Sequence, residues 1–136
     1  MTRQDLIRYV AETYGTDPEY PFPRDNVSCV FRHSGSRKWF ALLMQVPLKT
    51  LGLRGEGAAD ILNIKCDPVL IGSLRGKPGF LPAYHMNKDK WITLMLGDIP
   101  DQEEITGLLA LSYDLTAHKS KLPKKKYTDK DAGGAS

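Results

Sequence analysis

The sequence lacks the features that mark exported, membrane or metal-cluster proteins. It has only two cysteines, Cys29 and Cys66, and both lie in apolar segments. No apolar run approaches the ~18 residues that are needed to cross a bilayer, and the first residues hold no apolar stretch of the signal-peptide kind. We therefore expect a cytoplasmic protein that inserts into no membrane. Its cysteines are expected to be buried thiols, with a disulfide between them as the alternative.

The motifs of common catalytic and metal sites are also missing. The histidines His33, His85 and His118 lie in separate segments, and no Cys-x-x-Cys or His-x-x-x-His spacing occurs. Ser73 has no G-x-S-x-G context. The glycines of GLRGEG at 52–57 are not followed by the Lys and Ser or Thr of a phosphate-binding loop. We expect no cofactor and no metal ion.

Positive charge is concentrated at one end of the chain. The formal net charge is +3, but residues 119–136 hold six of the 19 basic residues and only two of the 16 acidic ones. Residues 1–118 therefore hold 13 basic and 14 acidic residues and are close to neutral. We predict one domain over residues 1–118 and a basic, disordered tail over 119–136, which has almost nothing to bury. The lysines at 124–126 could attract phosphates or could simply keep the chain soluble.

Apolar periodicity and turn residues predict an α+β domain. We expect helices at about 3–14, 68–75 and 101–117, strands at 27–32, 38–46, 60–66, 83–86 and 91–96, and a helical turn at 47–51. The element order is thus α-β-β-β-α-β-β-α. This order is typical of a two-layer arrangement in which helices pack against one face of an antiparallel sheet.

All three helix starts carry recognisable caps. Thr2 and Asp5 have the spacing of a capping box at the start of the first helix. Asp67 can cap a short helix whose first residue is Pro68, since proline has no N–H to leave unpaired there. Val69 is expected on the apolar face of this helix. Asp101 and Glu104 have the spacing of a capping box at the start of the last helix.

The tips of two predicted hairpins combine basic, polar and aromatic side chains. A wing that enters a nucleic-acid groove needs cations for the phosphates, a hydrogen-bonding group and an aromatic plane that can stack on a base. The alternative is that the tips are merely solvated and that each tryptophan anchors the core. The candidate residues are Arg32, His33, Arg37, Lys38 and Trp39 in the first tip, and His85, Asn87, Lys88, Lys90 and Trp91 in the second. We predict that both tips form one binding face.

A thiol site is a further possibility. Cys66 precedes a helix N-terminus, which lowers a thiol pKa, and His85 on a nearby strand could act as its base. The alternative is a small buried residue between a strand and a helix. The sequence leaves both interpretations open.

Several short segments are uncommon and occur in a familiar order. They include YPFP at 20–23, KWFAL at 38–42, DILNIKCDP at 60–68, PGFLPAYHMNK at 78–88 and LSYDLTA at 111–117. Together they resemble the MmcQ/YjbR family of small bacterial proteins over nearly the whole chain except the tail. The resemblance implies an α+β fold with this element order, similar to type III secretion chaperones. It also implies the family's label, a predicted DNA-binding protein with a double-wing arrangement, and no agreed catalytic residues.

Three classes of function therefore follow from the sequence. The first is a small non-enzymatic protein that binds DNA through its hairpin tips and its tail. The second is a protein-interaction or chaperone-like module, which would expose an apolar patch or dimerise. The third is a small-ligand protein or thiol enzyme with a pocket near Cys66 and His85. We expect a monomer or a weak homodimer.

Overall fold

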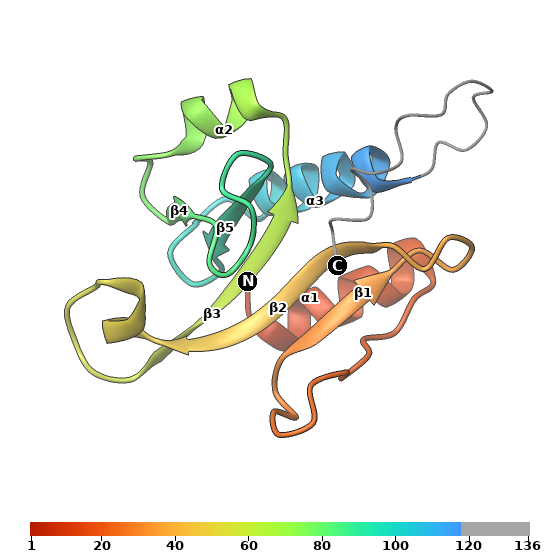
Figure 1. The fold of residues 1–136 in the computed structure, drawn as a ribbon, viewed down its shortest axis with the longest axis horizontal. Coiled ribbons are helices and arrows are strands. Elements are labelled where there is room, and N and C mark those ends of the chain that lie inside the picture. Colours follow the sequence, from red (N-terminus) through yellow and green to blue (C-terminus); the bar gives the residue numbers. More distant parts are fainter. Residues whose placement is uncertain (118–136) are drawn as a thin grey trace.

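The computed structural model describes residues 1–117, which form three α-helices, a 3-10 helix and a five-stranded sheet (Figure 1). The elements in chain order are α1 (Arg3–Tyr14), β1 (Cys29–Arg32), β2 (Trp39–Pro47), η1 (Leu48–Leu51), β3 (Ala58–Lys65), α2 (Pro68–Leu74), β4 (Phe80–Pro82), β5 (Trp91–Met95) and α3 (Gln102–Thr116). The strands pair antiparallel in the order β1-β2-β3-β5-β4. The predicted fold class and element order are confirmed. The predicted tail, with His118, lies outside the described residues.

The short helix α2 begins as its cap predicts. The side chain of Asp67 accepts a hydrogen bond from the Val69 amide at 2.8 Å, and Pro68 occupies the first helical position. Ile71 and Leu74 are buried against the sheet. Val69, by contrast, is 81% exposed, so the expectation that it faces the core is wrong. In so short a helix, only one side reaches the sheet, and Val69 lies on the other.

The cap of α3 differs from the predicted capping box. Asp101 accepts a hydrogen bond from the Glu103 amide at 2.9 Å. The carboxylate of Glu104 does not return to the cap. It instead contacts the ammonium of Lys77, 2.7 Å away in the connection that follows α2. The ion pair with Lys77 therefore replaces the hydrogen bond to the helix start that the local pattern predicts for Glu104.

The fourth strand lies earlier in the chain than predicted. β4 pairs Phe80 with Leu94 and Pro82 with Ile92, and residues 83–90 form a loop rather than a strand and a short tip. The pairing ends after Pro82 because the Tyr84 amide donates to the side chain of Thr93 at 2.9 Å instead of to backbone. The predicted strand at 83–86 is therefore wrong.

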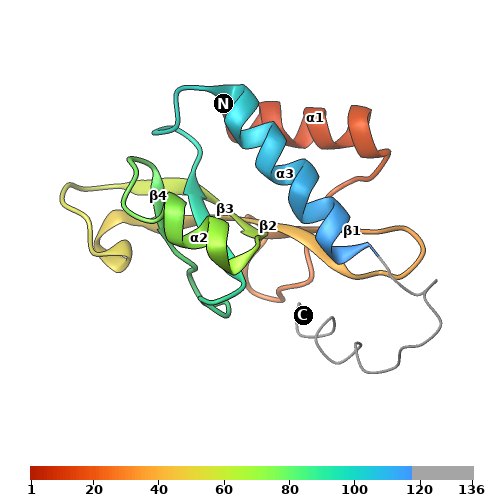
Figure 2. The same cartoon turned by 90° about the horizontal axis from the view of Figure 1, so that it is seen from above.

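The main core lies between the sheet and the helices. Alternate residues of the central strands, such as Leu62 of β3 and Leu94 of β5, are fully buried on this face. They pack with Leu6 of α1, Ile71 of α2 and Ile105 of α3 in one cluster. Figure 2 shows α1 and α3 on the same side of the sheet. The predicted helices on one face of an antiparallel sheet are confirmed.

The other face of the sheet is covered by loops. A smaller cluster of Val46, Ile61 and Met95 lies there, and Leu81 and Tyr84 pack against it. Figure 2 shows the loop at 83–90 on this side, away from α1 and α3. The loop that carries four of the ten predicted site residues thus packs on the face of the sheet opposite α1 and α3.

Candidate nucleic-acid interface

Both predicted tips leave the same end of the sheet. Ala41 of β2, Ile64 of β3 and Ile92 of β5 lie side by side in the register. The turn at 33–38 precedes β2 and the loop at 83–90 precedes β5, so the two segments are separated at their base only by β3. Two strand spacings correspond to about 10 Å. One extended polyanion could therefore contact both segments.

The arginines of the first tip are paired within the protein. Glu19 lies in a segment that is bridged to β1, and its carboxylate contacts Arg32 Nε at 2.9 Å and Arg37 Nη2 at 2.7 Å. The hydrogen bond from Arg37, together with that from Arg32, lowers the pKa of Glu19. Arg32 also lies 5.6 Å from the ring centroid of Trp39. Because both arginines already form an ion pair with Glu19, they are less available to bind a phosphate.

His33 is part of the core rather than of an exposed tip. It is 8% exposed, its Nε2 lies 2.8 Å from the hydroxyl of Thr116, and its ring packs on Tyr113 and Phe40 with centroid distances of 4.2 and 5.2 Å. The side chain therefore links the β1–β2 turn to the end of α3. It is not accessible to a nucleic acid.

This burial predicts a pH dependence of stability. Burial lowers the pKa of His33 in the folded protein, while an unfolded histidine takes up a proton as the pH falls through ~6.5. The free energy of unfolding should therefore fall below that pH, until the folded His33 also becomes protonated. Urea titrations between pH 7.5 and about 5 should show a smaller fall for His33→Phe. The variant His85→Asn, which removes an exposed histidine, is measured beside it as the comparison for the loss of a histidine. Parallel profiles for wild type and His33→Phe would contradict the assignment.

The remaining residues of the first tip are half-buried. Trp39 packs edge-on against Phe22, with ring centroids 6.4 Å apart. Its Nε1 is buried and has no hydrogen-bond partner among residues 1–117. Lys38 is also half-buried, and no ion pair to it occurs within the described part of the chain. The first tip thus offers one cation, Lys38, beside a packed tryptophan.

The second tip keeps its exposed polar side chains. His85, Asn87, Lys88 and Lys90 are all exposed, whereas Trp91 is 3% exposed and belongs to the core. None of the ion pairs within residues 1–117 involves either lysine. Four of the ten predicted side chains therefore form one accessible group, which we call the loop site: His85, Asn87, Lys88 and Lys90.

The loop that holds this site is internally ordered. His85 has a φ of 60°, which is uncommon for a residue with a side chain, and its ring stacks on that of Tyr84 with centroids 3.9 Å apart. Asn87 accepts a hydrogen bond from the Asp89 amide at 2.8 Å. Arg75 donates to the backbone carbonyl of Lys88 at 3.3 Å. These contacts hold the two lysines in a defined loop rather than on a mobile tip.

Two buried polar residues anchor the loop to the sheet. Asn63 of β3 donates from Nδ2 to the carbonyl of Tyr84 at 3.0 Å, and the Tyr84 amide donates to the hydroxyl of Thr93 at 2.9 Å. The Thr93 hydroxyl in turn donates to Asn63 Oδ1. Asn63 and Thr93 are completely buried. Sequence reasoning missed both, although an asparagine within an otherwise apolar strand is a signal for such a network.

The thiol site that the sequence left open receives no support from the geometry. Cys66 is 2% exposed, and burial raises the pKa of its thiol above the ordinary value. The lowered thiol pKa that a reactive cysteine needs is therefore not found here. No hydrogen bond joins Cys66 to His85 in the described residues, and neither residue lines the cavity beside Asp60 and Asp98. Both cysteines are free and buried, which confirms the thiol interpretation over a disulfide.

Residues 1–117 offer neither a metal site nor a membrane-spanning helix. No group of three or more histidine, cysteine or acidic side chains could hold a metal ion. No helix in the same range has the length and hydropathy of a membrane span.

The comparisons with known proteins point to one family. The family model described as YjbR matches residues 11–115. The chain is 40% identical to the uncharacterized protein YyaQ of Bacillus subtilis over 116 residues, which cover 85% of this chain and 98% of that protein. A crystal structure of a Pseudomonas syringae protein matches with a TM-score of 0.82 and 43% identity, covering 85% of this chain and 98% of that one. A crystal structure from Deinococcus radiodurans matches with a TM-score of 0.64 and 26% identity, covering 97% and 88%.

Proposed function

This chain belongs to the YjbR family, and we propose that it binds nucleic acid through the loop site. The observation that carries the proposal is the pair of lysines, Lys88 and Lys90, which are exposed and have no ion pair among the described residues. Their loop is held by hydrogen bonds to the buried side chains of Asn63 and Thr93 before any ligand binds. A preorganised loop loses little conformational entropy on binding, so more of the contact energy contributes to affinity.

The chemistry of the loop suits phosphate contacts more than base recognition. Two lysine ammonium groups would contact phosphates, and Lys38 at the same end of the sheet would add a third cation. The stacked rings of Tyr84 and His85 offer a flat surface to an unpaired base. Because residues 1–118 are nearly neutral, we expect modest, salt-dependent affinity with little sequence preference.

The chaperone-like alternative lacks a comparable observation. It requires a contiguous apolar surface, but the exposed large apolar residues of residues 1–117 are scattered. Tyr20 and Val27 lie between α1 and β1, Val69 lies on α2 and Leu115 on α3. The loop site is therefore the better supported binding surface.

Reversing the two loop charges should weaken binding about tenfold. Fluorescence anisotropy of a labelled duplex would be measured with the full chain and with Lys88→Glu/Lys90→Glu at several salt concentrations. The slope of log affinity against log salt should become shallower by about two, because two phosphate contacts are lost. The matched control is Arg24→Glu/Lys49→Glu, which makes the same change in net charge at exposed positions outside the loop. It should retain most of the affinity and the original slope.

A second variant separates the loop from the basic tail. Replacement of Lys124, Lys125 and Lys126 by glutamine should lower the affinity without abolishing binding. If this variant loses all binding while Lys88→Glu/Lys90→Glu binds like the wild type, the tail alone attracts the duplex and the proposal is wrong. Equal losses for the loop variant and its control would also contradict it, because net charge alone would then explain the result.

A further inference from the structure

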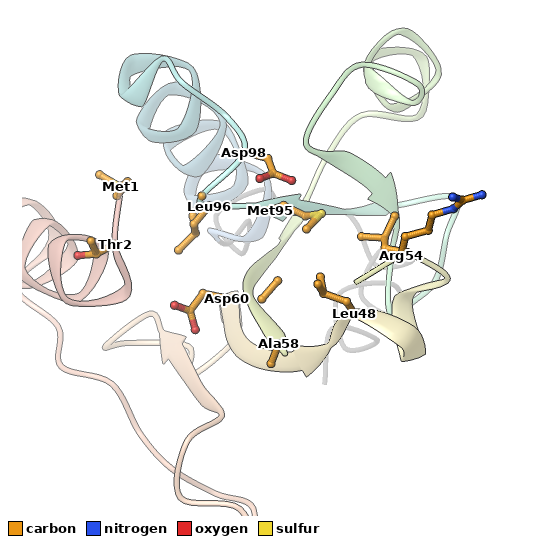
Figure 3. A pocket seen from close by; sticks show the side chains of 12 residues that line it. Met1, Thr2, Leu48, Arg54, Ala58, Asp60, Met95, Leu96 and Asp98 are labelled. Atoms are coloured by element: carbon orange, nitrogen blue, oxygen red, sulfur yellow. The ribbon is translucent and has the colours of Figure 1, made fainter. Parts of the chain in front are cut away.

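A cavity of about 650 Å³ lies at the end of the sheet opposite the loop site (Figure 3). Its walls come from the N-terminus of α1, the segment after η1, the start of β3 and the turn between β5 and α3. The volume falls in the range of small-molecule sites, about 300 to 1,000 Å³. The cavity therefore has room for a small ligand and is separate from the proposed nucleic-acid surface.

The walls combine apolar side chains with two carboxylates. Leu48, Leu53 and Met95 line the cavity together with Asp60 and Asp98. Asp60 accepts one hydrogen bond from Gln45 at 3.4 Å. Within the described residues, no ion pair holds either of these two carboxylates.

The one basic side chain that lines the cavity lies away from the carboxylates. Figure 3 shows Asp60 and Asp98 toward the side of Met1, while Arg54 extends from the opposite side. Met95 and Leu48 lie between them in the same view. A cationic ligand group beside the carboxylates would therefore be kept apart from the guanidinium, with its apolar body over the two apolar side chains.

The backbone adds hydrogen-bonding groups at the same place. The Leu96 amide donates a hydrogen bond to the carbonyl of Asp60 at 3.1 Å. The chain then forms a turn, in which the Asp98 amide donates to the Met95 carbonyl at 3.0 Å. Antiparallel strands alternate the edge to which each residue turns its N–H and C=O. Those of Ala58 therefore share an edge with those of Asp60, beyond the last residue of β5. The carbonyl of Ala58 can accept a hydrogen bond from a ligand.

We propose that this cavity binds a small amphipathic cation, a protonated aliphatic amine. Its ammonium group lies on the side of the cavity that carries Asp60 and Asp98 and donates to one of these carboxylates, because charge-assisted hydrogen bonds are stronger than neutral ones. Its aliphatic chain lies against Leu48, Leu53 and Met95, where burial of apolar surface stabilises the complex. An aliphatic carboxylate of the same length would meet two like charges at the same place.

The test uses three ligands of equal chain length. The full chain, labelled with ¹⁵N, is titrated with hexylammonium, hexan-1-ol or hexanoate at millimolar concentrations, and amide chemical shifts are followed. We expect hexylammonium to shift the lining residues and to bind at least about tenfold more tightly than the alcohol, since charge-assisted bonds contribute roughly 1.5–3 kcal/mol. Asp60→Asn/Asp98→Asn should remove this preference. Glu12→Gln/Glu103→Gln, which neutralises two exposed carboxylates elsewhere, should keep it.

Each other outcome counts against the proposal. Equal affinities for the amine and the alcohol would mean that the carboxylates take no part. Tighter binding of hexanoate would assign the site to Arg54 and an anionic ligand. An absence of shifts at the lining residues with all three ligands would show that the cavity takes no aliphatic amine. The ¹⁵N spectrum of Asp60→Asn/Asp98→Asn must retain the dispersion of the folded protein, and the alcohol should still bind to it as it does to the wild type.

Discussion

Gly79→Ala is expected to lower the free energy of unfolding by about 3 kcal/mol. Gly79 has a φ of 89°, a conformation that residues with a side chain rarely adopt. A Cβ atom there would lie 2.5 Å from Cγ1 of Ile99 and 3.4 Å from the backbone carbon of Asp98. Ile99 is buried, so its side chain has little room to move. The carbonyl of Gly79 also accepts the Met95 amide at 2.8 Å, which fixes the backbone.

Gly72→Ala is the matched control for this substitution. Gly72 lies within α2, is exposed, and has no heavy atom within 4 Å of the position that a Cβ would occupy. Alanine is favoured over glycine in a helix interior by up to about 1 kcal/mol, so this variant should be as stable as the wild type or more so. Urea denaturation of both variants measures the difference. A Gly79→Ala protein with wild-type stability would show that β4 and the turn at 98–99 are not packed as described.

Asn63→Leu is expected to lower the free energy of unfolding by a similar amount, about 3 kcal/mol. Leucine has the same number of side-chain heavy atoms as asparagine but leaves the carbonyl of Tyr84 and the hydroxyl of Thr93 without the partners described above. Each unsatisfied buried polar group costs about 1–3 kcal/mol. Urea denaturation gives the loss in stability, and hydrogen exchange at the Tyr84 amide shows whether the loop has detached from the sheet.

The double variant Asn63→Leu/Thr93→Val distinguishes the network from simple packing. Removing both side-chain partners leaves only the Tyr84 backbone groups unpaired, and these can turn to water if the loop moves. The double variant should therefore be more stable than the sum of the two single changes predicts. Strictly additive losses would contradict a coupled network.

The same variant connects stability to the proposed function. If the loop site binds nucleic acid because it is preorganised, Asn63→Leu should weaken duplex binding at temperatures where the protein is still folded, although both lysines are present. Unchanged affinity in the folded variant would mean that the charges of Lys88 and Lys90 act without a fixed loop.

The sequence by itself determined the elements that depend on short-range patterns. The start of α2 follows from Asp67 and Pro68, because both act within one helical turn. The strands β2 and β3 follow from their apolar runs, because such a run predicts a buried strand whichever strands it pairs with. The order of helices and strands then predicted the fold class, an α+β domain with an antiparallel sheet.

Only the tertiary structure decided which predicted site residues are accessible. Arg32 and Arg37 are paired because a segment before β1 places Glu19 beside them. His33 is buried because α3, more than 60 residues later in the chain, ends against it. The loop at 83–90 is fixed by Asn63 of a different strand. These outcomes depend on contacts between residues that are distant in the sequence. Neither periodicity nor local motifs indicate which distant residue will pack against a given side chain.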